Sequence, residues 1–166
     1  MKKKILSVLM ATAMVLSLGA CGSSDSGSGS GSDGKYTVGI CQLVQHDALD
    51  AATQGFKDAL VEELGEENVT FDEQNAQNDP NTCATIVNGF VSANVDLILA
   101  NATPALQAAA SATQDIPILG TSVTEYGVAL DIADFNGKTG INVSGTSDLA
   151  PLDQQAALFE ELNIAK

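Results

Sequence analysis

The chain has 166 residues, of which 45% are hydrophobic and 17% charged, enough apolar material for a folded core. Seven lysines, no arginine and 21 acidic residues give a formal net charge of −14, which becomes −17 without the three lysines of residues 2–4. Such an acidic chain repels nucleic acid and anionic lipid headgroups, so both are poor partners. No run reaches about 18 consecutive apolar residues, so no membrane-spanning helix is expected.

The N-terminus has the three-part layout of a secretory signal peptide. A basic end is followed by an apolar run, residues 5–18, and then by Leu-Gly-Ala-Cys, so residues 1–20 are predicted to be removed. The Leu18–Cys21 quartet resembles a bacterial lipobox, which implies a diacylglyceryl thioether on Cys21, with acyl chains such as palmitate anchoring the protein. An ordinary cleavage site with a chance cysteine is the alternative. Residues 21–34 then form the modified cysteine and a flexible Gly/Ser linker.

From Lys35 onward, strand-type and helix-type patterns alternate. Short β-branched runs are followed by segments with apolar residues at helical spacing, and Gly or Pro separates them. Repeated strand–helix units predict an α/β fold with a parallel sheet of about five strands and helices on both faces. The expected strands are 36–43, 69–75, 95–100, 116–120 and 139–143, and the expected helices are 47–64, 80–92, 103–114 and 151–162.

Three helix starts carry specific signals. Asp79-Pro80 and Thr103-Pro104 each place an N-cap type before a proline. Ser122-Val123-Thr124-Glu125 matches a capping box and predicts a further short helix.

In an open α/β sheet, ligands bind outside the carboxyl ends of the strands. The segments that follow the five strands are rich in Asn, Gln, Ser and Thr and poor in permanent charge. Hydroxyls and helix N-terminal amides suit a carboxylate, and Asp148 suits an ammonium, so the set favours a small zwitterion. Capping alone could explain Asp79, Thr103, Ser122 and Asp148, and a hydrogen-bonded or solvated ring could explain His46. The segments are 42–46, 75–79, 101–103, 121–124 and 144–148.

Catalytic and metal motifs are missing from the sequence. It contains no G-x-S-x-G elbow and no glycine-rich phosphate loop, and His46 is the single histidine. Cys41 and Cys83 lie among core-type residues, which favours buried free thiols over a disulfide, and neither has a neighbour at metal-ligand spacing. We therefore expect no enzyme, no catalytic residue, no cofactor and no metal.

The runs GICQLVQHDALDAATQGFKDAL, LILANATPALQAAA, IPILGTSVTEY and NVSGTSDLAPLDQQAAL resemble ABC-transporter substrate-binding lipoproteins of the tryptophan/tyrosine-binding type. The resemblance implies a two-lobed periplasmic-binding-protein fold at the extracytoplasmic face of the cell membrane. Such a receptor delivers an amino acid, for example an aromatic one, or a similar small zwitterion to a membrane ABC permease. It also implies which residues line the cleft: Gln42, His46, Asn101, Ala102, Thr103, Thr121, Ser122, Gly145, Thr146, Ser147 and Asp148.

The resemblance further divides the chain. Residues 35–147 correspond to the first lobe, and residues 148–166 to the crossover and the first helix of a second lobe that this sequence does not contain. The apolar stripe of that helix, which includes Leu152 and Phe159, is expected to fold back on the first lobe, to make a dimer contact or to remain exposed. A sugar receptor of similar architecture, or a lipid-anchored sensory module, is the alternative function.

Overall fold

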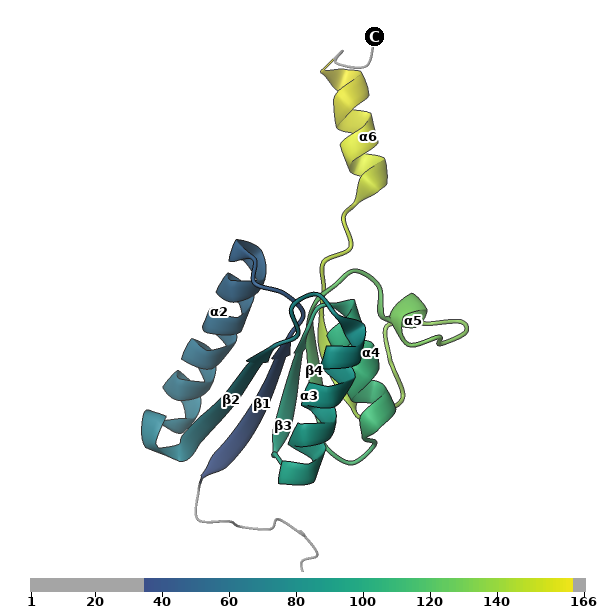
Figure 1. Ribbon diagram of the computed structural model, residues 1–166. Helices are drawn as coiled ribbons and strands as arrows, with labels where there is room; N and C mark the ends of the chain where they lie inside the picture. The colour runs from purple at the N-terminus through teal and green to yellow at the C-terminus, as the bar shows by residue number, and fades with distance from the viewer. Residues whose placement is uncertain (1–34, 163–166) are drawn as a thin grey trace, which may run out of the picture. The chain divides into compact units, whose positions relative to one another are not determined.

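The computed structural model describes residues 35–162, so the expected signal peptide, Cys21 and the linker lie outside the described residues. The core is a five-stranded, all-parallel sheet in the order β2-β1-β3-β4-β5 (Figure 1). This order confirms the predicted α/β lobe. The strands are β1 (Tyr36–Gln42), β2 (Val69–Asn75), β3 (Leu97–Asn101), β4 (Ile118–Val123) and β5 (Val143–Ser147).

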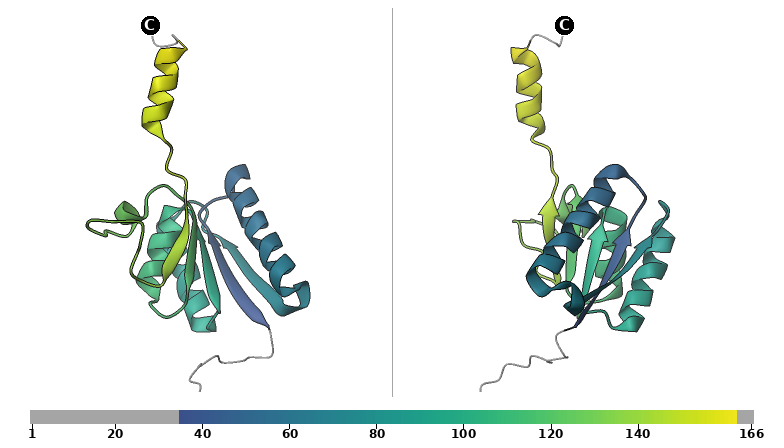
Figure 2. Two further views of the ribbon diagram at one scale, coloured as in Figure 1. Left: turned by 180° about the vertical axis from the view of Figure 1, so that it is seen from behind. Right: turned by 90° about the vertical axis from the view of Figure 1, so that its left-hand side faces the viewer.

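Helices cover both faces of the sheet, as a parallel sheet requires (Figure 2). On one face, α2 packs its Phe56, Leu60 and Val61 against apolar residues of β1, β2 and β3. On the other face, α3 and α4 bury a larger cluster that includes Phe90 and Leu106. The helical elements are α2 (Asp47–Leu64), the short 3-10 turn η1 (Glu66–Asn68), α3 (Pro80–Ala93), α4 (Thr103–Ala112), α5 (Tyr126–Ala129) and α6 (Leu152–Glu161).

Cys41 on β1 and Cys83 on α3 are both fully buried free thiols in the larger cluster, which confirms the expectation. Burial, and secondarily the neighbouring Cys83, raises the pKa of Cys41 to about 12. Burial also raises the pKa of Cys83. Both sulfhydryls therefore behave as small apolar core groups at neutral pH.

Two of the three predicted helix starts need correction. Asp79 caps α3 as expected, since its carboxylate accepts a hydrogen bond from the Asn81 amide at 2.9 Å. Thr103, however, is the first residue of α4, and Ala102 precedes it as a cap without a side-chain bond. The predicted capping box is wrong: Ser122 lies within β4, and Glu125 itself caps α5 by accepting from the amides of Gly127 and Val128.

Three strands begin later than predicted, and side-chain hydrogen bonds occupy the residues before two of them, β3 and β5. Before β3, Asp96 exchanges hydrogen bonds with Thr37 through its amide and its carboxylate. β4 begins at Ile118 instead of residue 116. Before β5, the Asn142 side chain donates to the carbonyls of Thr113 and Ile116, so residues 139–142 form a connection instead of a strand.

α6 buries no residue, and its Leu152, Phe159 and Leu162 are more than half exposed. In the structure this apolar stripe therefore remains exposed and does not fold back on the lobe. Among the helices of residues 35–162, none is both long and apolar enough to cross a bilayer.

Candidate ligand-binding site

The register of the sheet places several predicted site residues in one row at its carboxyl edge. Gln42 of β1 pairs with Asn75 of β2 and with Asn101 of β3. Asn101 in turn pairs with Thr121 of β4. The end of β5 continues the row, since Gly120 pairs with Gly145 after which the register shifts at a bulge. The segments predicted at the ends of the five strands therefore meet at one edge.

Two amides of this row, those of Gln42 and Asn101, are buried beneath the edge and bonded to α2. The Asn101 Nδ2 group donates to the Leu49 carbonyl at 2.9 Å and to the Thr53 hydroxyl at 3.0 Å. Thr53 donates to Gln42 Oε1 at 2.7 Å, and Gln42 Nε2 donates to Asp50 Oδ1 at 2.6 Å. We call Gln42, Thr53 and Asn101 the edge network. It fixes the first turns of α2 to the ends of β1 and β3.

The edge network leaves one atom unbonded. Asn101 is fully buried, and its Oδ1 is the one buried side-chain polar atom without a hydrogen-bond partner in residues 35–162. Turning the amide over would place this oxygen against the Leu49 carbonyl, so the Nδ2 bonds fix its orientation. Gln42 acts on the site by holding its loops, because both polar atoms of its side chain are already bonded. Asn101 holds the same loops through its Nδ2 group and keeps an unbonded Oδ1.

His46 is exposed and caps α2, with its Nδ1 accepting from the Ala48 amide at 3.2 Å. The carbonyl of Val44, in the same loop, accepts from Gln42 Nε2 at 3.0 Å. The structure therefore has the hydrogen-bonded ring given above as the alternative for His46. The residue lies in the exposed loop that follows β1.

The junction of β3 and α4 is backbone-strained. Ala102 has φ 93° and ψ 157°, a conformation that residues with a Cβ rarely adopt, and its amide donates to the Thr121 carbonyl at 3.0 Å. Thr103 opens α4, a helix of 10 residues whose first-turn amides have no partner within the helix. A strained backbone such as that of Ala102 is typical of functional sites. The free amides of the first turn of α4 suit an anion.

The end of β5 is exposed but tied to β4. The hydroxyl of Ser147 donates to the Thr124 carbonyl at 2.7 Å, and the Asp148 amide donates to the Val123 carbonyl at 3.1 Å. Asp148 is exposed at this edge, and it does not cap α6, whose N-cap is Pro151.

A hollow of about 360 Å³ is lined by α2 and by residues of β3, β4 and β5. It brings together the predicted residues Thr121, Gly145 and Thr146 with apolar walls from α2 and the strands. Its remaining lining residues are Ala52, Phe56, Leu99, Leu119 and Gly120.

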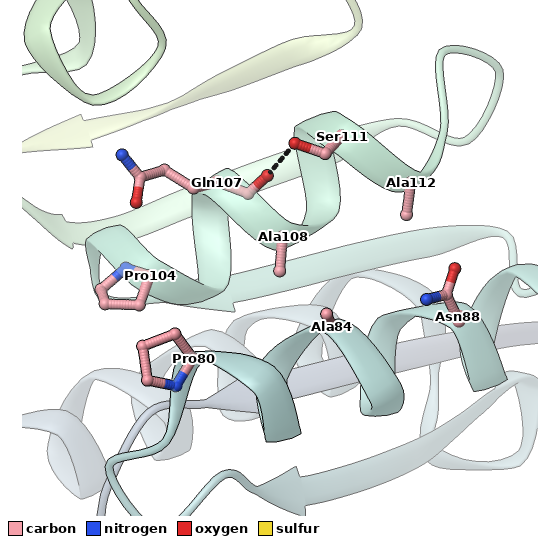
Figure 3. Close-up of a pocket in the computed structure, with 8 residues that line it drawn as sticks. All are labelled: Pro80, Ala84, Asn88, Pro104, Gln107, Ala108, Ser111 and Ala112. Carbon is pink, nitrogen blue, oxygen red and sulfur yellow. Dashed lines mark hydrogen bonds between the residues drawn. The ribbon is translucent and has the colours of Figure 1, made fainter.

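A second depression of about 360 Å³ lies between α3 and α4 (Figure 3). Small side chains of the two helices, such as Ala84 and Ala108, face each other across it. It contains none of the predicted site residues. Within residues 35–162, no group of three or more His, Cys, Asp or Glu side chains is placed to hold a metal ion.

Sequence reasoning missed Thr53 and Tyr126, both of which support the edge. Thr53 is a polar residue in the apolar stripe of α2, between Leu49 and Phe56, and a buried hydroxyl in such a stripe signals a bonding partner. Tyr126 had no comparable signal, because its role depends on a bulge between β4 and β5.

A five-stranded parallel lobe with its polar loops at the carboxyl edge defines this chain as a periplasmic-binding-protein-like lobe. The sequence of residues 37–163 matches the family profile described as ABC transporter substrate binding protein. Because this match covers most of the chain, the protein belongs to that family.

Named relatives agree with this assignment. The chain is 42% identical over 169 residues to the "Tyrosine-binding protein" of Clostridioides difficile (strain R20291), covering 96% of this chain and 49% of that protein. It resembles the ligand-free, open structure of a substrate binding protein with adhesive properties from Clostridium difficile at a TM-score of 0.69 and 46% identity, over 75% of this chain and 43% of that one.

It also resembles the ABC domain in complex with L-Trp from Streptococcus pneumonia at a TM-score of 0.69 and 35% identity, over 76% of this chain and 43% of that one. The chain thus spans about half the length of the relatives it matches.

Proposed function

We propose that this chain provides the first ligand-binding lobe of an extracytoplasmic receptor that supplies an amino acid, an aromatic one, to an ABC importer. The observation that carries the proposal is the row of polar groups that the register assembles at the carboxyl edge. Family membership and the tyrosine and tryptophan named for two relatives support the ligand class. The role is binding and delivery, not catalysis.

Within the site, the ligand carboxylate is assigned to the first turn of α4, where Thr103 and the unbonded amides lie, with Thr121 beside it. Asp148 is assigned to the ammonium, because its carboxylate stands at the edge while its backbone is held by Val123. His46, Ala102, Ser122 and the 145–147 segment complete the wall. Ser122 is included because it lies near the carboxyl end of β4, although it does not begin a helix.

A titration tests the ligand class. The chain from residue 35 onward is labelled with ¹⁵N and titrated separately with L-tryptophan, L-tyrosine, L-glutamate and D-glucose, and amide shifts are followed. We expect saturable shifts confined to the strand ends at 42–46, 101–103, 121–122 and 145–148 with the two aromatic amino acids. Shifts with glucose alone would favour a sugar receptor, and no shift with any probe at millimolar concentration would contradict the assignment to this lobe.

The membrane attachment rests on the sequence. Lipidation at Cys21 would tether the lobe to the extracytoplasmic face of the membrane through the Gly/Ser linker, within reach of a permease. Replacing Cys21 with Ser should leave an unprocessed precursor or release the protein into the medium. Mass spectrometry of the membrane fraction that finds an unmodified mature Cys21 would contradict the anchor.

A further inference from the structure

The phenol of Tyr126 occupies a space that two glycines leave open. Tyr126 is 6% exposed, and its hydroxyl donates to the carbonyl of Thr146 on β5 at 3.2 Å. A Cβ atom at Gly120 or at Gly145 would collide with the phenol oxygen, and at Gly145 it would also collide with the Gly120 backbone. The ring therefore reaches the joint between β4 and β5 because both paired positions lack a side chain.

This joint is irregular and lies inside the candidate site. Between Gly120 and Val123 the pairing of β4 with β5 shifts, and Ser122 takes a left-handed φ of 56° there. A bulge interrupts the ladder, so the last residues of β5 lose regular strand bonds. Beyond the shift, Val123 pairs with Ser147. The other bonds that tie these residues to the β4–α5 segment are Ser147 to Thr124, Asp148 to Val123, and the one from Tyr126.

We infer that Tyr126 is a positioning residue of the ligand-binding edge: its hydroxyl holds Thr146, and with it Ser147 and Asp148, in place across the bulge. Tyr126 does not contact the ligand itself, because it lies buried under the strand ends. The part of the inference that concerns ligand affinity rests on the proposed function, whereas the hold on β5 does not.

Tyr126→Phe removes the hydroxyl and keeps the ring, and Tyr36→Phe is the matched control at an exposed position at the start of β1. Hydrogen exchange of the two variants is compared with that of the unaltered chain. Losing one hydrogen bond should speed exchange of the 145–148 amides by roughly 2- to 10-fold in Tyr126→Phe, with α3 unchanged. Unchanged exchange at 145–148, or an equal rise throughout the lobe, would overturn the inference.

Affinity for L-tryptophan and L-tyrosine is measured in the same three proteins. We expect the affinity to fall by roughly 2- to 10-fold in Tyr126→Phe and to stay unchanged in Tyr36→Phe. The fall should exceed the loss of affinity that a change in global stability would cause. Equal affinity in all three proteins would overturn the positioning role. If the unaltered chain binds neither probe, the proposed function fails, while the exchange result still decides whether Tyr126 holds β5.

A second measurement covers the case in which Tyr126→Phe does not fold. The sequence has two tyrosines and no tryptophan, so in the Tyr36→Phe chain the ultraviolet absorbance of tyrosinate reports on Tyr126 alone. Burial, followed by the charge of Asp148, raises the pKa of Tyr126. Ionisation of Tyr126 at the pH of a free tyrosine would show that the ring is not buried at the joint between β4 and β5 and would overturn the inference.

Discussion

The hydroxyl of Thr53 donates a hydrogen bond of 2.7 Å to Gln42 Oε1 and accepts one of 3.0 Å from Asn101 Nδ2. One buried hydroxyl on α2 thereby joins the ends of two adjacent strands, β1 and β3. Since the two amides come from the sheet and the hydroxyl from the helix, this contact sets where α2 begins relative to the ligand-binding edge.

Replacing Thr53 with Val should destabilise the lobe, because the shape is kept while Gln42 Oε1 and one Asn101 N–H lose their partner. Leaving buried polar groups unsatisfied costs about 1 to 3 kcal/mol each at most, so we expect a loss in the free energy of unfolding of about that size. Urea denaturation followed by circular dichroism measures it. Thr53→Ser keeps the hydroxyl and should recover most of the loss; equal destabilisation by Ser and Val would argue against the network.

Replacing Gly145 with Ala should be severely destabilising. The added methyl group would meet the Gly120 backbone and the Tyr126 hydroxyl, and Gly145 also has φ 153°. Gly89→Ala on α3 is the control, because nothing lies within 4 Å of its Cβ position. There, Ala should stabilise the helix by about 0.5 to 1 kcal/mol. A Gly145→Ala protein with an unchanged thermal midpoint would show that the joint between β4 and β5 relaxes easily.

Thr103→Ala should weaken binding of the aromatic amino acid. Loss of a hydrogen bond to a carboxylate costs about 1.5 to 3 kcal/mol, or roughly a tenfold to hundredfold change in Kd. Ser111→Ala is the control on the same helix, since that exposed hydroxyl bonds only to the Gln107 carbonyl of its own turn. Calorimetric titration with L-tryptophan compares them, and equal Kd values for the two variants would remove Thr103 from the site.

Alkaline pH should destabilise the lobe at pH values below those at which its buried thiols and phenol lose their protons in the folded state. Burial raises the pKa of Cys41 to about 12 and also raises the pKa of Cys83 and of Tyr126. In the unfolded chain these groups lose their protons near their ordinary values of about 8.5 and 10, so the protonated fold is fully stable below that range and loses stability as pH rises toward 12.

The check is the urea midpoint at pH 8 and at pH 10.5 for the unaltered chain and for Cys41→Ala. We expect a smaller fall between the two pH values in the variant, which has one thiol fewer to ionise. An equal fall of the urea midpoint in both proteins would show that groups other than Cys41 cause the loss of stability at alkaline pH.

Acid should act through the cap of α3. The Asn81 amide, followed by the Thr82 hydroxyl, holds the pKa of Asp79 below its usual range. This contribution is present above the usual aspartate pKa and is lost as pH falls through the lowered value. Asp79→Asn keeps an acceptor but cannot titrate, so its thermal midpoint should change less between pH 5 and pH 2. Asp58→Asn, at an exposed position of α2, should keep the full acid dependence.

The sequence was sufficient for the fold class because strand and helix patterns alternate cleanly, and Asp79-Pro80 marks its helix start with residues that act locally. Ser122 could not be placed in this way. Its Ser-x-x-Glu spacing is a local signal, but a non-local bulge against β5 keeps it in the strand. The bonding of Gln42 and Asn101 was equally hidden, since their shared partner is a hydroxyl in the second turn of α2.

The two buried thiols have a practical consequence for spectroscopy. A maleimide reacts with thiolate, and neither Cys41 nor Cys83 offers accessible thiolate at neutral pH. In a chain that begins after Cys21, a single cysteine introduced at the exposed Gln45 would therefore accept a fluorophore alone. The lobe could then report on events at its own rim without any removal of the native sulfur atoms.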